Sequence, residues 1–444
     1  MSINVLLFSI TLSILLYCSK YFGFAVNLGF VFSIFILFFF IFGYKIDFFN
    51  FSNYKIYFCI LLSLCYIFII NINKENSLDK DFLMLMVLLG SMILIISENL
   101  ILVYLALELQ TFSLFILISG NRSSIKSNEG GLKYFILGAI SSGFYLISIS
   151  VIYYVTNGLS IDHLNSLSDE SFNYIWKYIL LLSMFFKLSL FPLHFWIPDI
   201  YEASSNDIMA LVGSLPKISV LGFIIQLSLF SNLFLWCALG SIFIGTFGAI
   251  NQSKTKRLLA YSGISHIGLG LLTLSTFVKS GFEPSLLYIM LYVIGFINLV
   301  LLLSFYKNRD FTYLYDLSGF SRINMLIGIS WSLLLLSMGG LPPLSGFLIK
   351  WWVICSMIIN NYNYVGLFCV IMSAIGMIYY LRITTICYFQ KHYSFKVWEN
   401  AFLLSSSVES SRFYLGVGLY IICFLIFNPT PIIMAVDFSL LSFF

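Results

Sequence analysis

Apolar runs of about 20 residues, separated by short polar loops, follow one another along the chain. An α-helix rises about 1.5 Å per residue, so a run of this length crosses a hydrocarbon core of about 30 Å. A membrane β-barrel would instead show shorter segments of alternating polarity. The pattern therefore predicts about fourteen membrane-spanning helices. They fall near residues 3–19, 23–43, 54–72, 82–96, 100–118, 132–155, 174–195, 207–230, 233–250, 259–278, 284–305, 323–358, 364–389 and 413–427.

Three apolar stretches contain internal breaks. The block 82–118 would reach roughly 55 Å as one helix, and the polar residues 97–99 divide it. Pro192 interrupts the seventh helix, and the segment 339–343, Gly-Gly-Leu-Pro-Pro, interrupts the twelfth, which spans 323–358. Helices four to eight and nine to thirteen then form two groups of five, and an odd number of helices inverts the second group relative to the first. Paired Pro-interrupted helices in corresponding positions are typical of transporter cores built from inverted repeats.

The expected fold is an all-α polytopic membrane protein with four parts. An N-terminal three-helix segment covers residues 1–81, and the first five-helix repeat covers residues 82–232. The second, inverted repeat covers residues 233–390, and a C-terminal loop with the last helix covers residues 391–444.

Basic loop residues are distributed unequally when the spans alternate in direction. The basic side carries Lys74, Lys80, Arg122, Lys126, Lys254, Lys256, Arg257, Lys307, Arg309, Arg322, Lys391, Lys396 and Arg412. The opposite side carries mainly Lys45, Lys55 and Lys279, together with an acidic loop that contains Asp162, Asp169 and Glu170. The positive-inside rule assigns the basic side to the matrix or cytoplasm, so both termini are expected on the outer side.

The composition supports a membrane protein and excludes several functional classes. The chain is 60% hydrophobic and 9% charged, with a mean hydropathy of +0.98, whereas a soluble domain is about 25% charged. Its eight cysteines are scattered without a CxxC pair, so the sequence shows no ligand set for haem, iron–sulfur clusters or zinc. No basic run indicates nucleic-acid binding. The N-terminus lacks an Arg-rich presequence, and the richness in Phe, Tyr, Ile, Asn and Lys suits an organelle genome.

Four ionisable residues fall well inside the predicted spans: Glu108, Lys187, Lys217 and Lys350. Each costs about 2.5–3.5 kcal/mol on insertion scales, so such residues indicate function by default. Glu108 could pair with Lys187, and a pair whose spacing changes would move the lysine between its charged and neutral forms. This is the chemistry of a proton relay. The alternative is a static buried ion pair, or a lysine that extends to the membrane interface.

Other polar residues are weaker candidates. Lys133, near the inner end of the sixth helix, either extends to the interface or feeds the relay. His266, near the middle of the tenth helix, either shuttles protons or is a hydrogen-bonded packing residue. His194 is expected in the break of the seventh helix with a structural role. Asp199 and Glu202 are expected to cap helix ends or to bind loop partners.

The motifs around these residues resemble a known family. The stretch KLSLFPLHFWIPDIYEAS begins at Lys187, and GLPPLSGFLIKWWV contains Lys350. The other matching motifs are LELQTFSLF, EGGLKYFILGAISSG, PKIS and KRLLAYSGISHIG. Together they resemble the proton-conducting family that includes the antiporter-like subunits of respiratory complex I and of multisubunit sodium/proton antiporters. Asp199 and Tyr201 stand where other branches usually carry Ala-His, which favours the chain-two branch of complex I, NADH:ubiquinone oxidoreductase.

The resemblance implies a proton channel inside a larger enzyme. Glu108, Lys187 and Lys217 would lie in one half of the path and Lys350 in the exit half. Lys133 and His266 would lie on the connecting polar axis. The resemblance implies no cofactor in this chain, because NADH, FMN, the iron–sulfur clusters and ubiquinone would bind to other subunits.

The resemblance also implies partners and a location. The partners would be other membrane-arm subunits of complex I, including further antiporter-like subunits, and membrane lipids, with cardiolipin at the basic loops. The expected location is the mitochondrial inner membrane, as an organelle-encoded, multi-pass protein with both termini on the intermembrane-space side. Two alternatives stay open: a standalone or multisubunit cation/proton antiporter, and a structural membrane subunit with an inactive channel.

Overall fold

The computed structural model describes residues 52–72, 78–121, 123–161, 174–227, 232–276, 279–304, 313–318, 321, 325–390 and 409–440. The first two predicted spans lie outside these ranges, as do Lys45 and the acidic loop. All regular elements of the described ranges are helices, and no β-strand occurs among them. Six of these helices are long and apolar enough to cross a membrane. The prediction of an all-α, multispanning membrane protein is confirmed at this level.

Fifteen α-helices and one 3-10 helix lie within the described ranges. They are α3 (Asn53–Ile70), α4 (Leu78–Ile96), α5 (Leu100–Ile118), α6 (Ile125–Thr156), α8 (Tyr174–Leu188), α9 (Trp196–Ala203), α10 (Asn206–Leu227), α11 (Asn232–Ile250), α12 (Thr255–Leu274), α13 (Lys279–Ser304), η2 (Leu314–Leu317), α15 (Met325–Gly339), α16 (Ser345–Ile359), α17 (Asn363–Phe389), α19 (Glu409–Phe424) and α20 (Thr430–Leu440).

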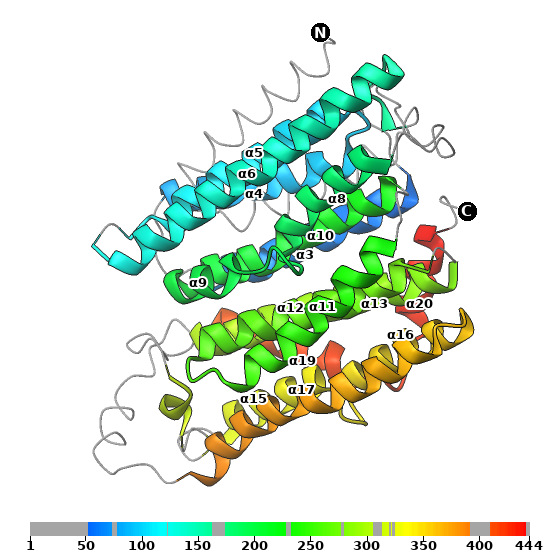
Figure 1. The fold of residues 1–444 in the computed structure, drawn as a ribbon. Coiled ribbons are helices and arrows are strands. Elements are labelled where there is room, and N and C mark those ends of the chain that lie inside the picture. The colour runs from blue at the N-terminus through cyan, green and yellow to red at the C-terminus, as the bar shows by residue number, and fades with distance from the viewer. Residues whose placement is uncertain are drawn as a thin grey trace.

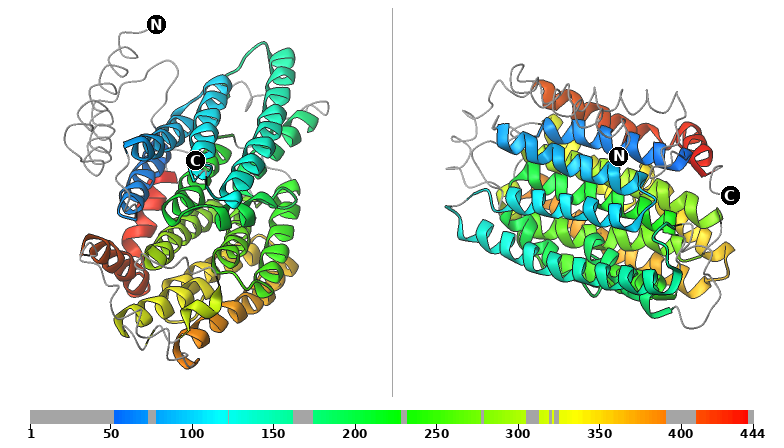
Figure 2. Two further views of the ribbon diagram at one scale, coloured as in Figure 1. Left: turned by 90° about the vertical axis from the view of Figure 1, so that its left-hand side faces the viewer. Right: turned by 90° about the horizontal axis from the view of Figure 1, so that it is seen from above.

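The helices form one bundle of two stacked groups (Figure 1). Helices α3 to α10 make up the first group, and α11 to α17 make up the second. Contacts of α10 with α13, and of α9 with α12, join the two groups. The C-terminal helix α20 returns to pack against α3 and α13, so the two ends of the described chain lie side by side (Figure 2).

All three predicted breaks are present. Helix α4 ends at Ile96 and α5 begins at Leu100. At the first proline-containing break, helix α8 ends at Leu188 and α9 begins at Trp196, whereas at the second, α15 ends at Gly339 and α16 begins at Ser345. Gly340, in the second proline-containing break, has a φ of 88°. A residue with a Cβ atom is strained in this left-handed region, so glycine suits the turn between the two half-helices.

Helix α10 is the core of the bundle. Every residue from Asp207 to Leu227 is buried, because α3, α4, α5, α8 and α13 surround the helix. A helix that is hydrophobic on all sides is expected to be buried in this way. Any polar side chain on α10 is therefore held inside the protein, away from both lipid and water.

The structure differs from the predicted helices at three places in particular. Helix α9, Trp196–Ala203, lies beyond residue 195, where the seventh helix was predicted to end. Helix α6 begins at Ile125, earlier than the expected residue 132, because the Ser124 side chain accepts a hydrogen bond from the Ser127 backbone N–H and caps the helix. Helix α20 was not predicted. Its 11 residues are too few to cross a membrane, and a search for spans of about 20 residues does not detect such a helix.

Lys55 is wrongly predicted as a loop charge. It lies in the first turn of α3, and only 2% of it is exposed. Its Nζ lies 3.6 Å from Glu98 Oε1 and donates a hydrogen bond to the Ile96 carbonyl at 3.4 Å. The hydropathy pattern missed this pair because it joins two residues that are distant in sequence.

We expect Glu98→Gln to destabilise the protein more than Lys55→Met does. Glu98→Gln leaves a buried ammonium without its carboxylate, and removing one partner of a buried pair costs up to about 3–5 kcal/mol. Lys55→Met leaves a carboxylate that is 28% exposed and can be hydrated. Thermal inactivation of the two variants in the native membrane would compare them, and equal effects would contradict this account.

Candidate proton path

Lys187 lies in the last turn of α8, directly before the helix break. Its side chain is 6% exposed, and its Nζ lies 5.8 Å from the centre of the Phe186 ring. The end of a helix carries a partial negative charge, which favours a cation at this position. Trp196 Nε1 donates a hydrogen bond to the Phe186 carbonyl at 3.0 Å, which satisfies one of the free carbonyls of the helix end.

The expected pair between Glu108 and Lys187 is not closed in the structure. No hydrogen bond or ion pair reaches Lys187 Nζ from the part of the chain that the structure describes. Glu108 instead accepts a hydrogen bond from Thr111 Oγ1 at 3.1 Å. Glu108 is nevertheless near enough for its charge to act on Lys187. Lys187 therefore forms no closed ion pair in this structure, and its role in a relay stays a prediction.

Lys217 follows Pro216 inside α10, and 1% of it is exposed. Its Nζ lies 3.5 Å from Tyr201 Oη, and the Tyr201 and Tyr292 ring centres are 5.9 and 5.7 Å away. Aromatic faces attract a cation, and this attraction strengthens away from water. The two tyrosines thus surround Lys217 with aromatic rings and hydroxyl groups. None of the ion pairs among the described residues includes Lys217.

His266 lies in the middle of α12 within a group of tyrosines. Its Nδ1 lies 2.6 Å from Tyr288 Oη, and its Nε2 lies 2.9 Å from Tyr380 Oη. One ring nitrogen of a neutral imidazole donates and the other accepts, so both bonds can form at once. The ring also stacks on Tyr292 at a centroid distance of 5.2 Å. This histidine is hydrogen-bonded and tightly packed, and it adjoins the tyrosine that lies beside Lys217.

Lys350 lies in α16, where it faces back toward the second helix break. Its Nζ donates a hydrogen bond to the Gly339 carbonyl at 2.6 Å, which satisfies a carbonyl at the end of α15. Lys350, His266 and Tyr292 line a common cavity of about 30 Å³. A cavity of this size has room for roughly one or two water molecules.

The structure brings three of the predicted residues together on one axis. Lys217, His266 and Lys350 lie in succession between the two helix breaks, and tyrosines fill the space between them. Lys187 stands at the first break, near Glu108. Lys187, Lys217 and His266 are buried and Lys350 is half-buried, and none of them takes part in an ion pair among the described residues.

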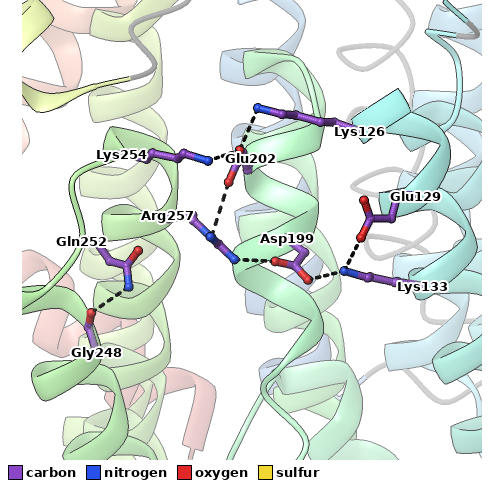
Figure 3. A network of polar contacts seen from close by, with 9 residues as sticks. All are labelled: Lys126, Glu129, Lys133, Asp199, Glu202, Gly248, Gln252, Lys254 and Arg257. Atoms are coloured by element: carbon purple, nitrogen blue, oxygen red, sulfur yellow. Dashed lines mark hydrogen bonds and ion pairs between the residues drawn. The ribbon is translucent and has the colours of Figure 1, made fainter. Parts of the chain in front are cut away.

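Lys133 belongs to a separate group of charged residues (Figure 3). We call this group the charged cluster, and it comprises Lys126, Glu129, Lys133, Asp199, Glu202, Lys254 and Arg257. These residues line a cavity of about 190 Å³ where α6, α9 and the start of α12 meet. Within the described ranges no hydrogen bond or ion pair joins Lys133 to the buried lysines, so its place in the relay stays a prediction.

Two carboxylates hold the charged cluster together. Asp199 accepts hydrogen bonds from Lys133 Nζ and Arg257 Nη2, each at 2.7 Å. Glu202 accepts hydrogen bonds from Lys126 at 3.0 Å and Lys254 at 2.5 Å. The two carboxylates therefore bind neighbouring helices and fix α9 between α6 and α12. Because Tyr201 lies on the same short helix, the cluster also fixes the phenol that contacts Lys217.

We expect Glu202 to make stability dependent on pH. Burial by itself would raise the pKa of the Glu202 carboxyl, but the hydrogen bonds from Lys254 and Lys126 outweigh it and hold this pKa below its ordinary value. A lowered folded-state pKa stabilises the protein above the unfolded value, about 4.3, and this contribution is lost as the pH falls through the folded value. Wild type and Glu202→Gln should differ in thermal midpoint at pH 7 and converge below about pH 4. A difference that persists unchanged at low pH would contradict the assignment.

The sequence did not single out the tyrosines of the path. Tyr288 and Tyr292 are four residues apart in α13 and so share one face of the helix, which is a usable signal. The chain contains 28 tyrosines, however, and 18% of its residues are aromatic, so the spacing was not distinctive. His194 lies in the break between α8 and α9, as predicted.

Comparison with known proteins shows the family of this chain. Residues 97–376 match the family model described as "NADH:quinone oxidoreductase/Mrp antiporter, TM". The chain is 35% identical over 376 residues to NADH-ubiquinone oxidoreductase chain 2 of Metridium senile, which covers 82% of this chain and 97% of the relative. It is 31% identical over 343 residues to NADH-quinone oxidoreductase subunit N of Pelagibacter ubique, which covers 72% of this chain and 71% of the relative.

Solved structures share the fold. A chain of respiratory complex I from Thermus thermophilus superposes with a TM-score of 0.80 at 23% identity, covering 96% of this chain and 98% of that chain. A chain of an archaeal membrane-bound sulfane sulfur reductase superposes with a TM-score of 0.84 at 18% identity, covering 95% and 91%. The fold and the buried charges define an antiporter-like membrane subunit. The chain belongs to the NADH:quinone oxidoreductase/Mrp antiporter family.

Proposed function

We propose that this chain is a proton-translocating membrane-arm subunit of respiratory complex I, NADH:ubiquinone oxidoreductase. The observation that carries the proposal is the buried axis on which Lys217, His266 and Lys350 lie between two broken helices. A charge buried without a carboxylate partner is expensive, and it is kept where protonation is part of the function. The relatives named as NADH-ubiquinone and NADH-quinone oxidoreductase subunits support this enzyme over a free-standing antiporter.

The chain would take part in catalysis only through proton movement. Electron transfer would take place in other subunits, which would bind NADH, FMN, the iron–sulfur clusters and ubiquinone. Glu108 and Lys187 would load the path, Lys217 and His266 would carry the proton across the centre, and Lys350 would lead to the exit. Lys133 would supply protons from the side of the charged cluster, whose cavity is lined by charged groups.

The finer features of the fold belong to the same proposal. The chain would have fourteen spans, with two inverted five-helix repeats at residues 82–232 and 233–390. Helices α8 and α9 would then correspond to α15 and α16, because each pair is one helix divided by a break. The charged cluster would face the matrix, and both termini would face the intermembrane space of a mitochondrion. Cardiolipin would bind the basic loops on the matrix side, and lipid analysis of the purified complex tests this.

A native gel of gently solubilised membranes tests the proposed function. Mass spectrometry would locate this chain relative to a band stained for NADH dehydrogenase activity. We expect the chain to comigrate with a very large NADH-oxidising complex. If the chain instead runs in a much smaller particle without that activity, the cation/proton antiporter becomes the better assignment, and cation-dependent proton flux should be measured.

A further inference from the structure

Tyr292 carries a buried hydroxyl group without a hydrogen-bond partner. The residue is 4% exposed, and its Oη has no partner in the part of the chain that the structure describes. Buried hydroxyl groups are normally hydrogen-bonded, so an unpaired one calls for an explanation. Its two neighbours in the tyrosine group, Tyr288 and Tyr380, both bond to His266. Tyr292 therefore differs from them in having a hydroxyl that is available for another role.

The Tyr292 hydroxyl and the Lys217 ammonium both lie close to Gly263. A Cβ atom on Gly263 of α12 would lie 2.7 Å from Tyr292 Oη and 3.5 Å from Lys217 Nζ. Both polar atoms thus border the space that the missing side chain of Gly263 leaves. A side chain at this position would lie too close to the phenol to leave it in place, and it would also touch the ammonium.

Tyr292 also borders the cavity that contains Lys350. The cavity of about 30 Å³ is lined by both residues and has room for roughly one or two waters. Tyr292 is therefore the residue that adjoins Lys217 on one side and the cavity of Lys350 on the other. His266 contributes differently, since both of its ring nitrogens are engaged by tyrosines and its ring stacks on Tyr292.

We propose that the Tyr292 hydroxyl passes the proton from Lys217 to the cavity of Lys350, through the space left by Gly263. This inference rests on the proposed proton-conducting function and names the group that connects its two lysines. The Lys217 side chain first moves within hydrogen-bonding distance of the phenolic oxygen, which it does not contact in the structure. Its ammonium then gives a proton to that oxygen, while the phenolic proton moves to a water molecule in the cavity. That water gives a proton to the neutral Lys350 amine. Rotation of the hydroxyl then restores the starting state, and no group is oxidised or reduced.

Tyr292→Phe in the assembled complex is the first test. It keeps the ring that stacks on His266 and removes only the hydroxyl. We expect NADH-driven proton translocation to fall by roughly tenfold, less than the 10²–10⁴ of a lost acid–base group in enzymes, since water can partly substitute. The matched control is Tyr145→Phe, which removes a buried hydroxyl that donates to the Leu100 carbonyl at 3.1 Å and does not line the cavity of Lys350. The control should retain normal translocation.

Gly263→Ala is an independent test of the same step. The added methyl group would lie 2.7 Å from Tyr292 Oη and 3.5 Å from Lys217 Nζ, so the phenol must shift although no polar group is removed. We expect a loss of translocation similar to that of Tyr292→Phe, and no further loss in the double variant, because both changes block one step. The solvent deuterium isotope effect on NADH-driven translocation should rise in each variant as this proton transfer becomes rate-limiting. A purely structural defect would leave the isotope effect unchanged.

Two outcomes separate this inference from the proposed function. If Lys217→Met stops translocation but Tyr292→Phe leaves both the rate and the isotope effect at wild-type values, the function stands and the assignment of Tyr292 is wrong. If Lys217→Met itself leaves translocation intact in an assembled complex, the proposed function fails, and the inference fails with it. If the losses of translocation in Tyr292→Phe and Gly263→Ala add up in the double variant, the two changes do not act on one step, and the inference is wrong.

Discussion

Replacement of Lys217 by methionine is expected to reduce NADH-driven proton translocation by about tenfold or more while the complex still assembles. The reason is that Lys217 is buried in α10 beside tyrosine rings and has no carboxylate partner among the described ion pairs. A methionine has a similar length and fits an apolar helix, and replacing a buried charge by an apolar residue is often neutral or stabilising. The main effect of Lys217→Met is therefore the loss of the titrating amine. Removal of a group that transfers protons typically lowers the rate by 10²–10⁴-fold.

Translocation should be measured with a pH-sensitive dye in sealed membrane vesicles, together with the amount of assembled complex. Lys177→Met serves as the matched control, because Lys177 lies on α8 and is partly exposed. The control should keep its pumping rate. Normal pumping by an assembled Lys217→Met complex would favour the structural subunit with an inactive channel.

Replacement of Lys350 should separate hydrogen bonding from proton transfer. Lys350 donates to the Gly339 carbonyl at 2.6 Å and so helps to close the second helix break. Lys350→Met removes both this bond and the titrating amine, whereas Lys350→Gln retains an N–H donor but cannot carry a proton. We expect both variants to lose translocation by about tenfold or more. We also expect only the methionine variant to lose stability, by about 1 kcal/mol for the unsatisfied carbonyl.

The two Lys350 variants can also contradict this assignment. Thermal midpoints of the assembled complex report stability, and vesicle assays report translocation. If Lys350→Gln pumps normally, the amine is needed only as a hydrogen-bond donor, and the exit half of the path must be reassigned.

Features that depend on single residues or short runs could be predicted from the sequence. The cost of placing a charge in an apolar span made Glu108, Lys187, Lys217 and Lys350 candidates without any knowledge of the fold, and their role stays a prediction. Pro192 and the Gly-Gly-Leu-Pro-Pro segment at 339–343 predicted two of the helix breaks, because a proline removes a backbone N–H donor. Proline alone is not decisive, since Pro216 lies inside the continuous helix α10. The lengths of the apolar runs predicted most helix bounds within a few residues.

The remaining features depend on contacts between distant segments. The pairing of Lys55 with Glu98, and the approach of Tyr201 to Lys217, join helices whose relative positions no local pattern specifies. The charged cluster arises only because α6, α9 and α12 meet at one end of the bundle. Residues that looked like loop charges, such as Lys254, are therefore part of a network that positions the path.

The burial of α10 has a consequence for the biogenesis of the chain. Helix α10 leaves the ribosome before α13, yet α13 supplies Tyr292 and covers one side of α10. During synthesis, Lys217 is therefore in contact with only part of its final surroundings, namely helices α3, α4, α5 and α8, until α13 has been inserted. The flank of α10 that α13 covers in the complete fold stays open until α13 has been inserted. Insertion factors or neighbouring subunits that bind this flank would determine how much of the chain matures and how much is degraded.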